Sequence, residues 1–148
     1  MNDYPVWWDT TITVFNRFED NQTNVISWYK TVIDGCFWKH IRDKISVGET
    51  VLETDKILCR IRKDERYKNR YDWERIPNDE MQNYFTLTQG DIIVKGSVDD
   101  EIDEYTEGQR SNDIVEKYKK YQGCFEIESC SDNTGVGRCN EHYIAEGL

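Results

Sequence analysis

The chain has 148 residues, a length that one domain accounts for. Hydrophobic residues make up 37% of it and aromatic residues 13%, so it can bury a modest core and wholesale disorder is not expected. The formal net charge of −10 argues against wrapping around duplex DNA, because that function needs a surface rich in Lys and Arg. An acidic wall would instead let DNA slide past without sticking.

The cysteine content and the hydropathy of the chain indicate the cellular compartment in which it folds. There are five Cys, and Met1–Thr10 carries two Asp and no apolar run, so it does not resemble a secretory signal. We therefore expect reduced thiols in a cytosolic environment. No stretch approaches the ~20 apolar residues of a transmembrane helix, so no membrane partner is expected.

The first half of the chain predicts three strands. In the first, Ile12 and Val14 lie on one face and Phe15 on the other. The second is rich in β-branched and aromatic residues, and Gly35 inside it predicts a bulge or bend that would help a sheet to curl. The polar stretch His40–Thr54 gives no clear prediction beyond a turn at its glycine. The expected strands are Thr11–Phe18, Ser27–Trp38 and Lys56–Lys63.

A long charged and aromatic segment, Asp64–Asn83, comes next. Loops longer than about 12–15 residues are uncommon in compact domains unless they are functional or disordered. Seven basic residues lie within Arg60–Arg75, interleaved with aromatic ones, a composition typical of nucleic-acid binding and equally of protein interfaces. Acidic residues in the same span favour a subunit-contact loop, with a solvated charged loop as the alternative. The residues expected to make contact are Tyr67, Arg70, Tyr71 and Trp73.

The second half predicts short strands around one helix. Ser111 is expected to cap the helix, and Gly123 to end it. The expected elements are the strands Tyr84–Thr88 and Asp91–Ser97, the helix Ser111–Tyr121, and a last hairpin of Cys124–Cys130 and Arg138–Ile144 around the loop Ser131–Gly137. The whole pattern predicts a mainly β fold over residues 1–148, a small antiparallel β-barrel or sandwich with one accessory α-helix.

Three stretches depart from this simple pattern: an N-terminal arm (1–10), the long loop (64–83) and an insertion that carries the helix (98–122). The arm contains Trp7 and Trp8, and exposed aromatic residues are a liability unless something covers them. Two interpretations are open: the arm folds back on the core, or it docks into a neighbouring subunit.

The sequence shows no motif typical of a metal site, a cofactor site or a catalytic site. The acidic run Val98–Gly108 lacks the spacing of an EF-hand, which favours a solvated loop over a calcium site. The late Cys and His residues lack the close Cys pairs of zinc sites, so buried thiols are expected. These residues are Cys124, Cys130, Cys139 and His142. Without a nucleophile elbow, a phosphate loop or a dinucleotide fingerprint, we expect a protein with no catalytic role, metal or cofactor.

Several blocks together resemble an uncharacterised family of tailed-phage and prophage structural proteins. The resemblance follows the order of the blocks from Thr10 to Gly147. The blocks are TITVFNRF, TVIDGCFW, YFTLTQGDIIVKGSVDDEI and, after a short helix, FEIESCSDNTGVGRCNEHYIAEG. The GDIIVKGSVDDEI block is the most specific part.

The same order of strands is similar to that of head–tail joining proteins, also called head-closure or stopper proteins. The segment Val98–Gln122 departs from the usual pattern of that group. The resemblance implies a ring, twelve copies in a head-closure protein, in the neck of the virion between portal or adaptor and tail proteins, with DNA passing through non-specifically. Within such a ring, we expect subunit contacts at the loop residues named above and at Trp7 and Trp8 because of their composition. We also expect a channel-facing set of acids that repels DNA phosphates, Asp99, Asp100, Glu101, Asp103 and Glu104.

Two alternatives accompany this prediction. Tail terminators and tail-completion proteins are also small β-rich rings, so the position in the neck is open. A different class is an acidic phage-encoded protein that binds and inhibits a host factor. In either case the protein would be made in the cytoplasm of a host bacterium.

Overall fold

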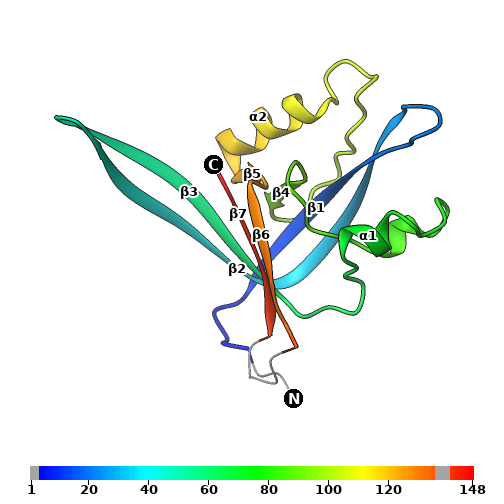
Figure 1. Ribbon diagram of the computed structural model, residues 1–148, viewed down its shortest axis with the longest axis horizontal. Helices are drawn as coiled ribbons and strands as arrows, with labels where there is room; N and C mark the ends of the chain where they lie inside the picture. The colour runs from blue at the N-terminus through cyan, green and yellow to red at the C-terminus, as the bar shows by residue number, and fades with distance from the viewer. Residues whose placement is uncertain (1–3, 136–140) are drawn as a thin grey trace.

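The computed structural model describes residues 4–135 and 141–148, which form a curled antiparallel half-barrel sheet with few helices (Figure 1). Strand accounts for 44% of the structure and helix for 13%, so the mainly β prediction is confirmed. The strands are β1 (Thr10–Glu19), β2 (Ile26–Val47), β3 (Thr50–Arg62), β4 (Ile92–Lys95), β5 (Cys124–Glu126), β6 (Ser129–Asn133) and β7 (His142–Gly147). They lie in the order β5-β4-β1-β2-β3-β7-β6. The helical elements are α1 (Arg70–Trp73), the 3-10 turn η1 (Met81–Asn83) and α2 (Ser111–Tyr121).

Strand β2 is much longer than the sequence predicts, because it takes part in two ladders. Its first half pairs with β1 as far as Cys36, and its second half pairs with β3 from Phe37 onward. Gly35 lies at the change of partner with a φ of +71°, and the register against β1 shifts there. A residue with a side chain rarely adopts this φ, which explains why a glycine occupies the position. The register shift confirms the bend that the sequence predicts there.

The two edge strands of the sheet, β5 and β6, are separated by only Ile127 and Glu128. The Ile127 N–H donates to the carbonyl of Asp91, and the Glu128 N–H donates to the carbonyl of Glu146, both at 2.8 Å. One segment of chain therefore lies against both ends of the curled sheet. The single strand predicted over Cys124–Cys130 is wrong for this reason, since its two halves pair with different strands.

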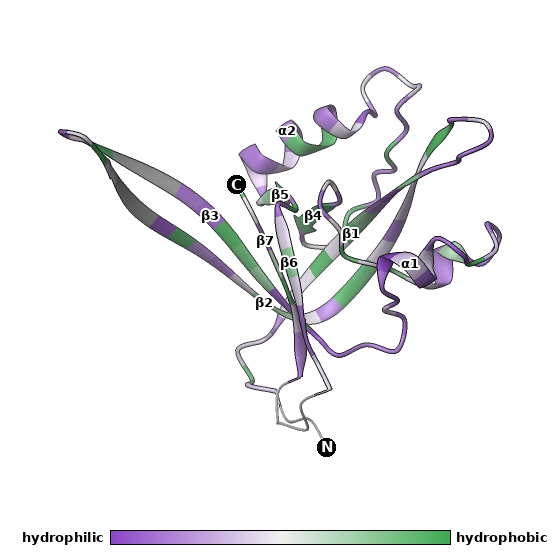
Figure 2. Ribbon diagram, in the orientation of Figure 1, coloured by the Kyte–Doolittle hydropathy of each residue, from purple (hydrophilic) through white to green (hydrophobic). Residues whose placement is uncertain are grey.

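Alternation along the strands builds two apolar layers. Ile12 and Val14 face the inside of the curled sheet, whereas Phe15 faces outward and packs beneath α2. The sequence predicts that these residues lie on opposite faces, but not which face lies inside. In Figure 2, the apolar face of α2 and the strands it covers lie together on the body. The inner core consists of Ile12, Val14, Ile33, Cys36, Ile57, Cys59, Ile61, Phe85, Leu87, Ile93, Phe125, Ile127, Tyr143 and Ala145.

Helix α2 has the predicted bounds and buries Ile114 and Tyr118 against the outer layer. Its N-cap is Arg110 rather than the predicted Ser111, and the Asp113 carboxylate accepts from the Arg110 N–H at 3.2 Å. The helix ends before Gly123, whose φ of +110° suits a glycine.

The strand predicted over Tyr84–Thr88 does not form. The Phe85 N–H donates to the carbonyl of Arg66 at 3.0 Å, and the Phe85 carbonyl accepts from the Lys68 N–H at 2.9 Å. These bonds tie the segment to the long loop instead of to a ladder. The last hairpin is β6 with β7, which begins at His142, and positions 136–140 of the predicted loop and strand lie outside the described residues.

The second half of β2 and the first half of β3 extend away from the body as a two-stranded hairpin, which is the long projection in Figure 1. We define the projecting arm as residues 41–56. Its register runs from Ile41 opposite Lys56 to Val47 opposite Thr50, and its turn contains Gly48 with a φ of +63°. The sequence predicts the turn at this glycine but not the two long strands beside it.

Candidate functional site

The structure places the long loop (64–83) against the half-barrel, where Tyr67 contributes to its closure. The Tyr67 ring stacks on Tyr143 with 4.0 Å between centroids and lies 5.7 Å from the Phe85 ring. Burial raises the pKa of Tyr67 to about 12. Its ring therefore packs on the inner core of its own chain.

Trp73 is completely buried, although the sequence predicts it as a subunit contact. Its ring meets Phe18 and Tyr29 edge to face, each with 5.9 Å between centroids. The guanidinium of Arg70 lies 4.8 Å from the centre of the Trp73 ring, within the range of a cation–π interaction. This burial corrects the assignment: Trp73 anchors the loop to β1 and β2 and has no free surface for a neighbour.

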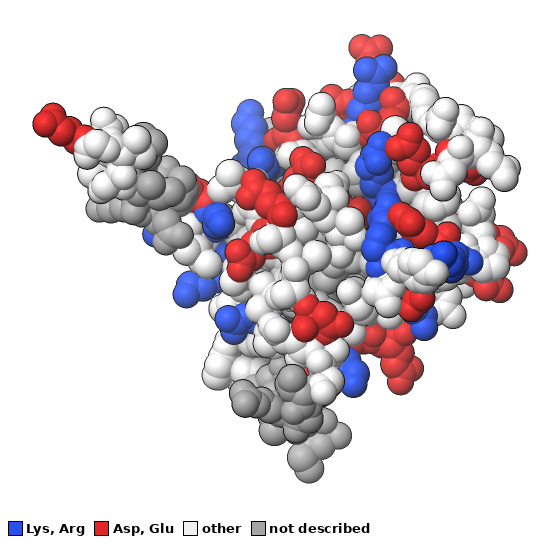
Figure 3. Space-filling view, viewed as in Figure 1, with Lys and Arg blue, Asp and Glu red and all other residues white. Residues whose placement is uncertain are grey.

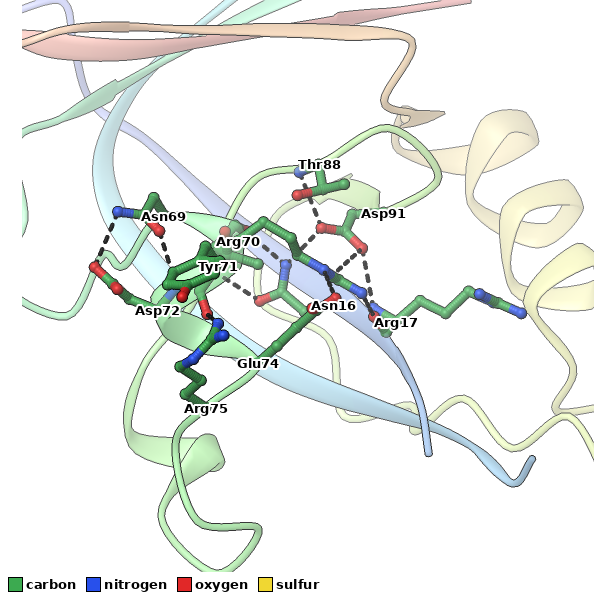
Figure 4. Close-up of polar contacts among 11 residues, drawn as sticks. Asn16, Arg17, Asn69, Arg70, Tyr71, Asp72, Glu74, Arg75, Thr88 and Asp91 are labelled. Atoms are coloured by element: carbon green, nitrogen blue, oxygen red, sulfur yellow. Dashed lines mark hydrogen bonds and ion pairs between the residues drawn. The ribbon is translucent and has the colours of Figure 1, made fainter. Parts of the chain in front are cut away.

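A group of polar contacts around Asp91, called here the polar clamp, connects the segment before β4 to β1 and α1 (Figure 4). The buried Asp91 carboxylate accepts from Asn16 Nδ2 at 2.9 Å, from the Arg17 N–H at 3.0 Å and from the Thr88 N–H at 3.1 Å. Arg70 Nη1 lies 3.9 Å from the same carboxylate. Burial raises the pKa of Asp91 to about 6 in spite of these partners. The clamp joins α1 and the approach to β4 to strand β1.

The other contacts of Arg70 also stay within the chain. Its Nε donates to Glu74 at 2.8 Å, and its Nη2 donates to the carbonyl of Arg17 at 2.7 Å. Among the four loop residues predicted for subunit contact, Tyr71 is the exposed one, with 65% of its surface accessible. The Arg75 guanidinium lies 3.4 Å from the centre of the Tyr71 ring. The loop therefore contributes Tyr71 and Arg75 to the surface.

The described part of the N-terminal arm folds back on the chain, which decides between the two interpretations left open. Trp8 is buried and packs edge to face on His142, with 5.5 Å between ring centroids. Arg62 holds the arm down, because its Nη2 donates to the carbonyl of Trp8 at 2.9 Å and its guanidinium lies over Tyr4. Trp8 thus belongs to the chain's own packing, while Trp7 is 64% exposed. Residues 1–3 lie outside the described part.

The predicted channel-facing acids lie on the loop that leads into α2, and most of them have partners there. Asp100 pairs with Lys117 at 2.9 Å, which holds the pKa of Asp100 below its usual range. Glu101 pairs with Lys30 at 2.9 Å. The remaining three lie in the same loop: Asp99 is exposed, Asp103 accepts from the Tyr105 N–H, and Glu104 accepts from the Ser111 N–H. In Figure 3, acidic and basic side chains are interspersed over this face of the body.

The projecting arm is the surface feature that the sequence did not predict. Val47 and Val51 near its tip are each 58% exposed. An ion pair between Arg42 and Asp55, with 3.3 Å between Nε and Oδ1, bridges its two strands. Its strands are hard to predict because charged residues interrupt the apolar positions, although Ile45 and Val47 alternate with Ser46. The arm extends away from the body without packing on it (Figure 1).

A cavity of about 300 Å³ lies between α2 and the sheet. Arg17, Trp28, Asn112 and Val115 are among its lining residues. Trp28 Nε1 is buried, and no hydrogen-bond partner for it appears among the described residues. The cavity is a local gap beneath the helix and is separate from the projecting arm.

The described residues hold no group of three or more His, Cys, Asp or Glu side chains placed to bind a metal. Cys124 is buried in β5 as expected, whereas Cys130 is exposed in β6, which corrects the expectation of a buried thiol there. Cys139 lies outside the described residues. Burial raises the pKa of the Cys124 thiol to about 12. Within residues 4–135 and 141–148, no helix has the length and apolar character to cross a membrane.

These features define a small mainly β protein whose curled half-barrel is closed by an internal loop and carries one projecting arm. The chain belongs to a family of unknown function, DUF6751, whose model matches residues 7–147. Searches of curated proteins and of solved structures found no significant match.

Proposed function

We propose that the protein is a non-enzymatic structural subunit of a tailed-phage neck, in a head–tail connector or head-closure ring that joins the portal complex to the tail. The projecting arm carries this proposal. A two-stranded hairpin is only marginally stable by itself, so a chain that extends one away from its body gains most when another subunit covers it. A ring subunit has such a neighbour on each side.

The rest of the proposed surface consists of exposed aromatic groups and the acidic loop. Trp7 and Tyr71 are large, exposed and suited to contacts with portal, adaptor or tail proteins. The acids from Asp99 to Glu104 would face the lumen, where negative charge keeps DNA phosphates from sticking. Replacing the exposed Asp99, Glu101 and Asp103 by Asn or Gln should then slow or strand DNA during ejection. Unchanged ejection would remove this part of the proposal.

A tail terminator or tail-completion ring would use the same architecture one position further along the particle. Deleting the gene distinguishes a head-closure position from a tail-terminator position by the incomplete particles that accumulate. Loss of a head-closure ring should leave free tails of normal length beside heads that lack tails. Loss of a tail terminator should leave tails of irregular length.

The decisive experiment combines this deletion with reconstruction of the neck by cryo-electron microscopy. Density for the chain in a ring between portal and tail, with twelve copies per particle by quantitative mass spectrometry, is the expected result for a head-closure protein. A well-resolved neck that lacks the chain, together with normal particles from the deletion strain, would overturn the proposal. The acidic binding protein that acts on a host factor would then be the leading alternative.

A further inference from the structure

In the part of the chain that the structure describes, two strand edges of the projecting arm have no partner strand: the edge of β2 and the outer edge of β3 from Thr50 to Lys56. Among the described residues, β2 pairs with β1 only as far as Cys36, and from Phe37 to Val47 it pairs with β3 alone. The other edge of β2 therefore presents backbone N–H and C=O groups along the length of the arm. Unpaired edges of this kind are templates for a strand from another chain.

A second unpaired edge lies on the body, at β6. This strand pairs with β7 on one side, and no described strand pairs with its other side. All five of its residues are exposed. It is therefore an acceptor for a further strand, and each copy of the chain has both an arm and this edge.

The two edges carry opposite charge. The arm edge begins with Lys39–Lys44 (KHIRDK), which has three basic residues and one acid. The segments Cys124–Asn133 and Glu141–Leu148, which contain β5, β6 and β7, have five acids and no Lys or Arg. Lys39 and Arg42 are exposed on β2, Arg42 within its ion pair with Asp55. Glu126 at the end of β5 and Glu128 next to β6 are exposed as well. In a chain of net charge −10, this basic edge is suited to the acidic edge of a second copy.

We propose that the β2 edge of the projecting arm pairs with β6 of a second copy of this chain, so that the sheet continues from one subunit into the next. The contact is heterologous, since the arm of each copy meets the body of the next, and it generates a ring when the rotation closes. Seven arm residues span roughly 20 Å, enough to reach across a neighbouring strand. The inference deepens the proposed function, on which it rests for the ring, by naming the contact that builds it.

Cross-linking tests the contact directly. All chains carry Cys139→Ser, and one copy carries Ser46→Cys in the arm together with Cys130→Ser. It is mixed with copies that retain the exposed Cys130 of β6. A short bismaleimide should give covalent dimers between the two kinds of copy, and the dimers should disappear when both carry Cys130→Ser. The matched control is Ser97→Cys, an equally polar exposed position on the body, which should give none.

A charge exchange tests the same contact without a reagent. Lys39→Glu with Arg42→Glu should abolish self-association in sedimentation velocity, and so should Glu126→Lys with Glu128→Lys. Mixing the two variants should restore association, because the charges are again opposite. The matched control, Lys119→Glu with Lys120→Glu on α2, should associate as the unmodified chain does. Failure of the exchanged pair to associate, or equal cross-linking at Ser97→Cys, would overturn the contact.

Failure of this inference is distinguishable from failure of the proposed function. A neck ring that contains the chain but gives no Ser46→Cys to Cys130 cross-link inside particles would remove the arm contact and leave the neck assignment. Cross-linked copies of the purified protein, with no copy in the virion, would keep the contact and remove the neck assignment. A chain that neither associates at high concentration nor cross-links in particles would remove the contact outright.

Discussion

The guanidinium of Arg62 lies across the backbone of Gly35, with its Nε donating to the Gly35 carbonyl at 2.7 Å. A Cβ atom at position 35 would stand 2.8 Å from Nε and Cζ of Arg62. The same guanidinium donates to the carbonyl of Trp8 at 2.9 Å. One side chain of β3 thus connects the bend of β2 to the N-terminal arm, and the close approach depends on a residue without a side chain.

Replacing Gly35 by Ala should therefore lower the free energy of unfolding by about 1–3 kcal/mol, because strain at φ +71° adds to the contact with Arg62. Urea denaturation measures the change. Gly108→Ala is the control for the conformational part, since Gly108 has a φ of +85° and no atom within 4 Å of the added Cβ. Equal losses in the two variants would show that the contact with Arg62 contributes nothing.

Asp91 should give the stability a specific pH dependence. Its pKa is raised from an ordinary 3.8 to about 6, so the native state holds the proton more tightly than the unfolded chain does. This group stabilises the native state most fully below about pH 4, and the contribution is lost as the pH rises through 6, a change of about 3 kcal/mol.

Comparison with Asp91→Asn isolates that contribution. The variant should be less stable overall, because an NH2 group replaces one carboxylate oxygen and sets its N–H donors either against the Arg17 N–H or against the donors of Asn16 and Thr88. The stability advantage of the unmodified chain should shrink between pH 4 and pH 7. A carboxyl resonance of Asp91 that titrates near 3.8 by NMR would contradict the expectation.

The burial of Trp73 predicts a large loss on truncation. Trp73→Ala should cost about 3–5 kcal/mol, because it removes a completely buried ring and the support of Arg70. Trp7→Ala, at an exposed position, should change the stability by less than about 0.5 kcal/mol. Thermal or chemical unfolding measures both changes in stability. A small effect of Trp73→Ala would contradict the burial of this residue.

The projecting arm should be dispensable for the folding of the body. Replacing residues 43–54 by Asn-Gly joins Arg42 to Asp55, which already face each other in the register. The free energy of unfolding should stay within about 0.5 kcal/mol, since the removed strands contact only one another in the ladder. Hydrogen exchange should show the backbone amides of the arm opening more readily than those of β1. Unfolding of the body on removal of the arm would contradict its independence.

The features that depend on local chemistry could be predicted from the order of the residues. Alternation placed Ile12 and Val14 on one face of the strand and Phe15 on the other, because a strand turns successive side chains to opposite faces. The bounds of α2 followed from an apolar stripe with a glycine after it. Gly35 marked the bend, since few other residues adopt its φ.

The partner that each segment takes depends instead on how the chain packs in three dimensions. Trp73 lies in a polar stretch, yet Phe18 and Tyr29 from distant strands enclose it. The segment around Phe85 has the composition of a strand, but its backbone bonds go to Arg66 and Lys68. The projecting arm pairs with itself beyond the reach of the core, and charged residues interrupt its apolar positions, so its strand pattern is weak. For Trp73 and Phe85 the deciding contacts join residues far apart in the chain, and local composition does not reveal such contacts. For the projecting arm the strands are not buried, so burial does not impose a clear hydropathy pattern on them.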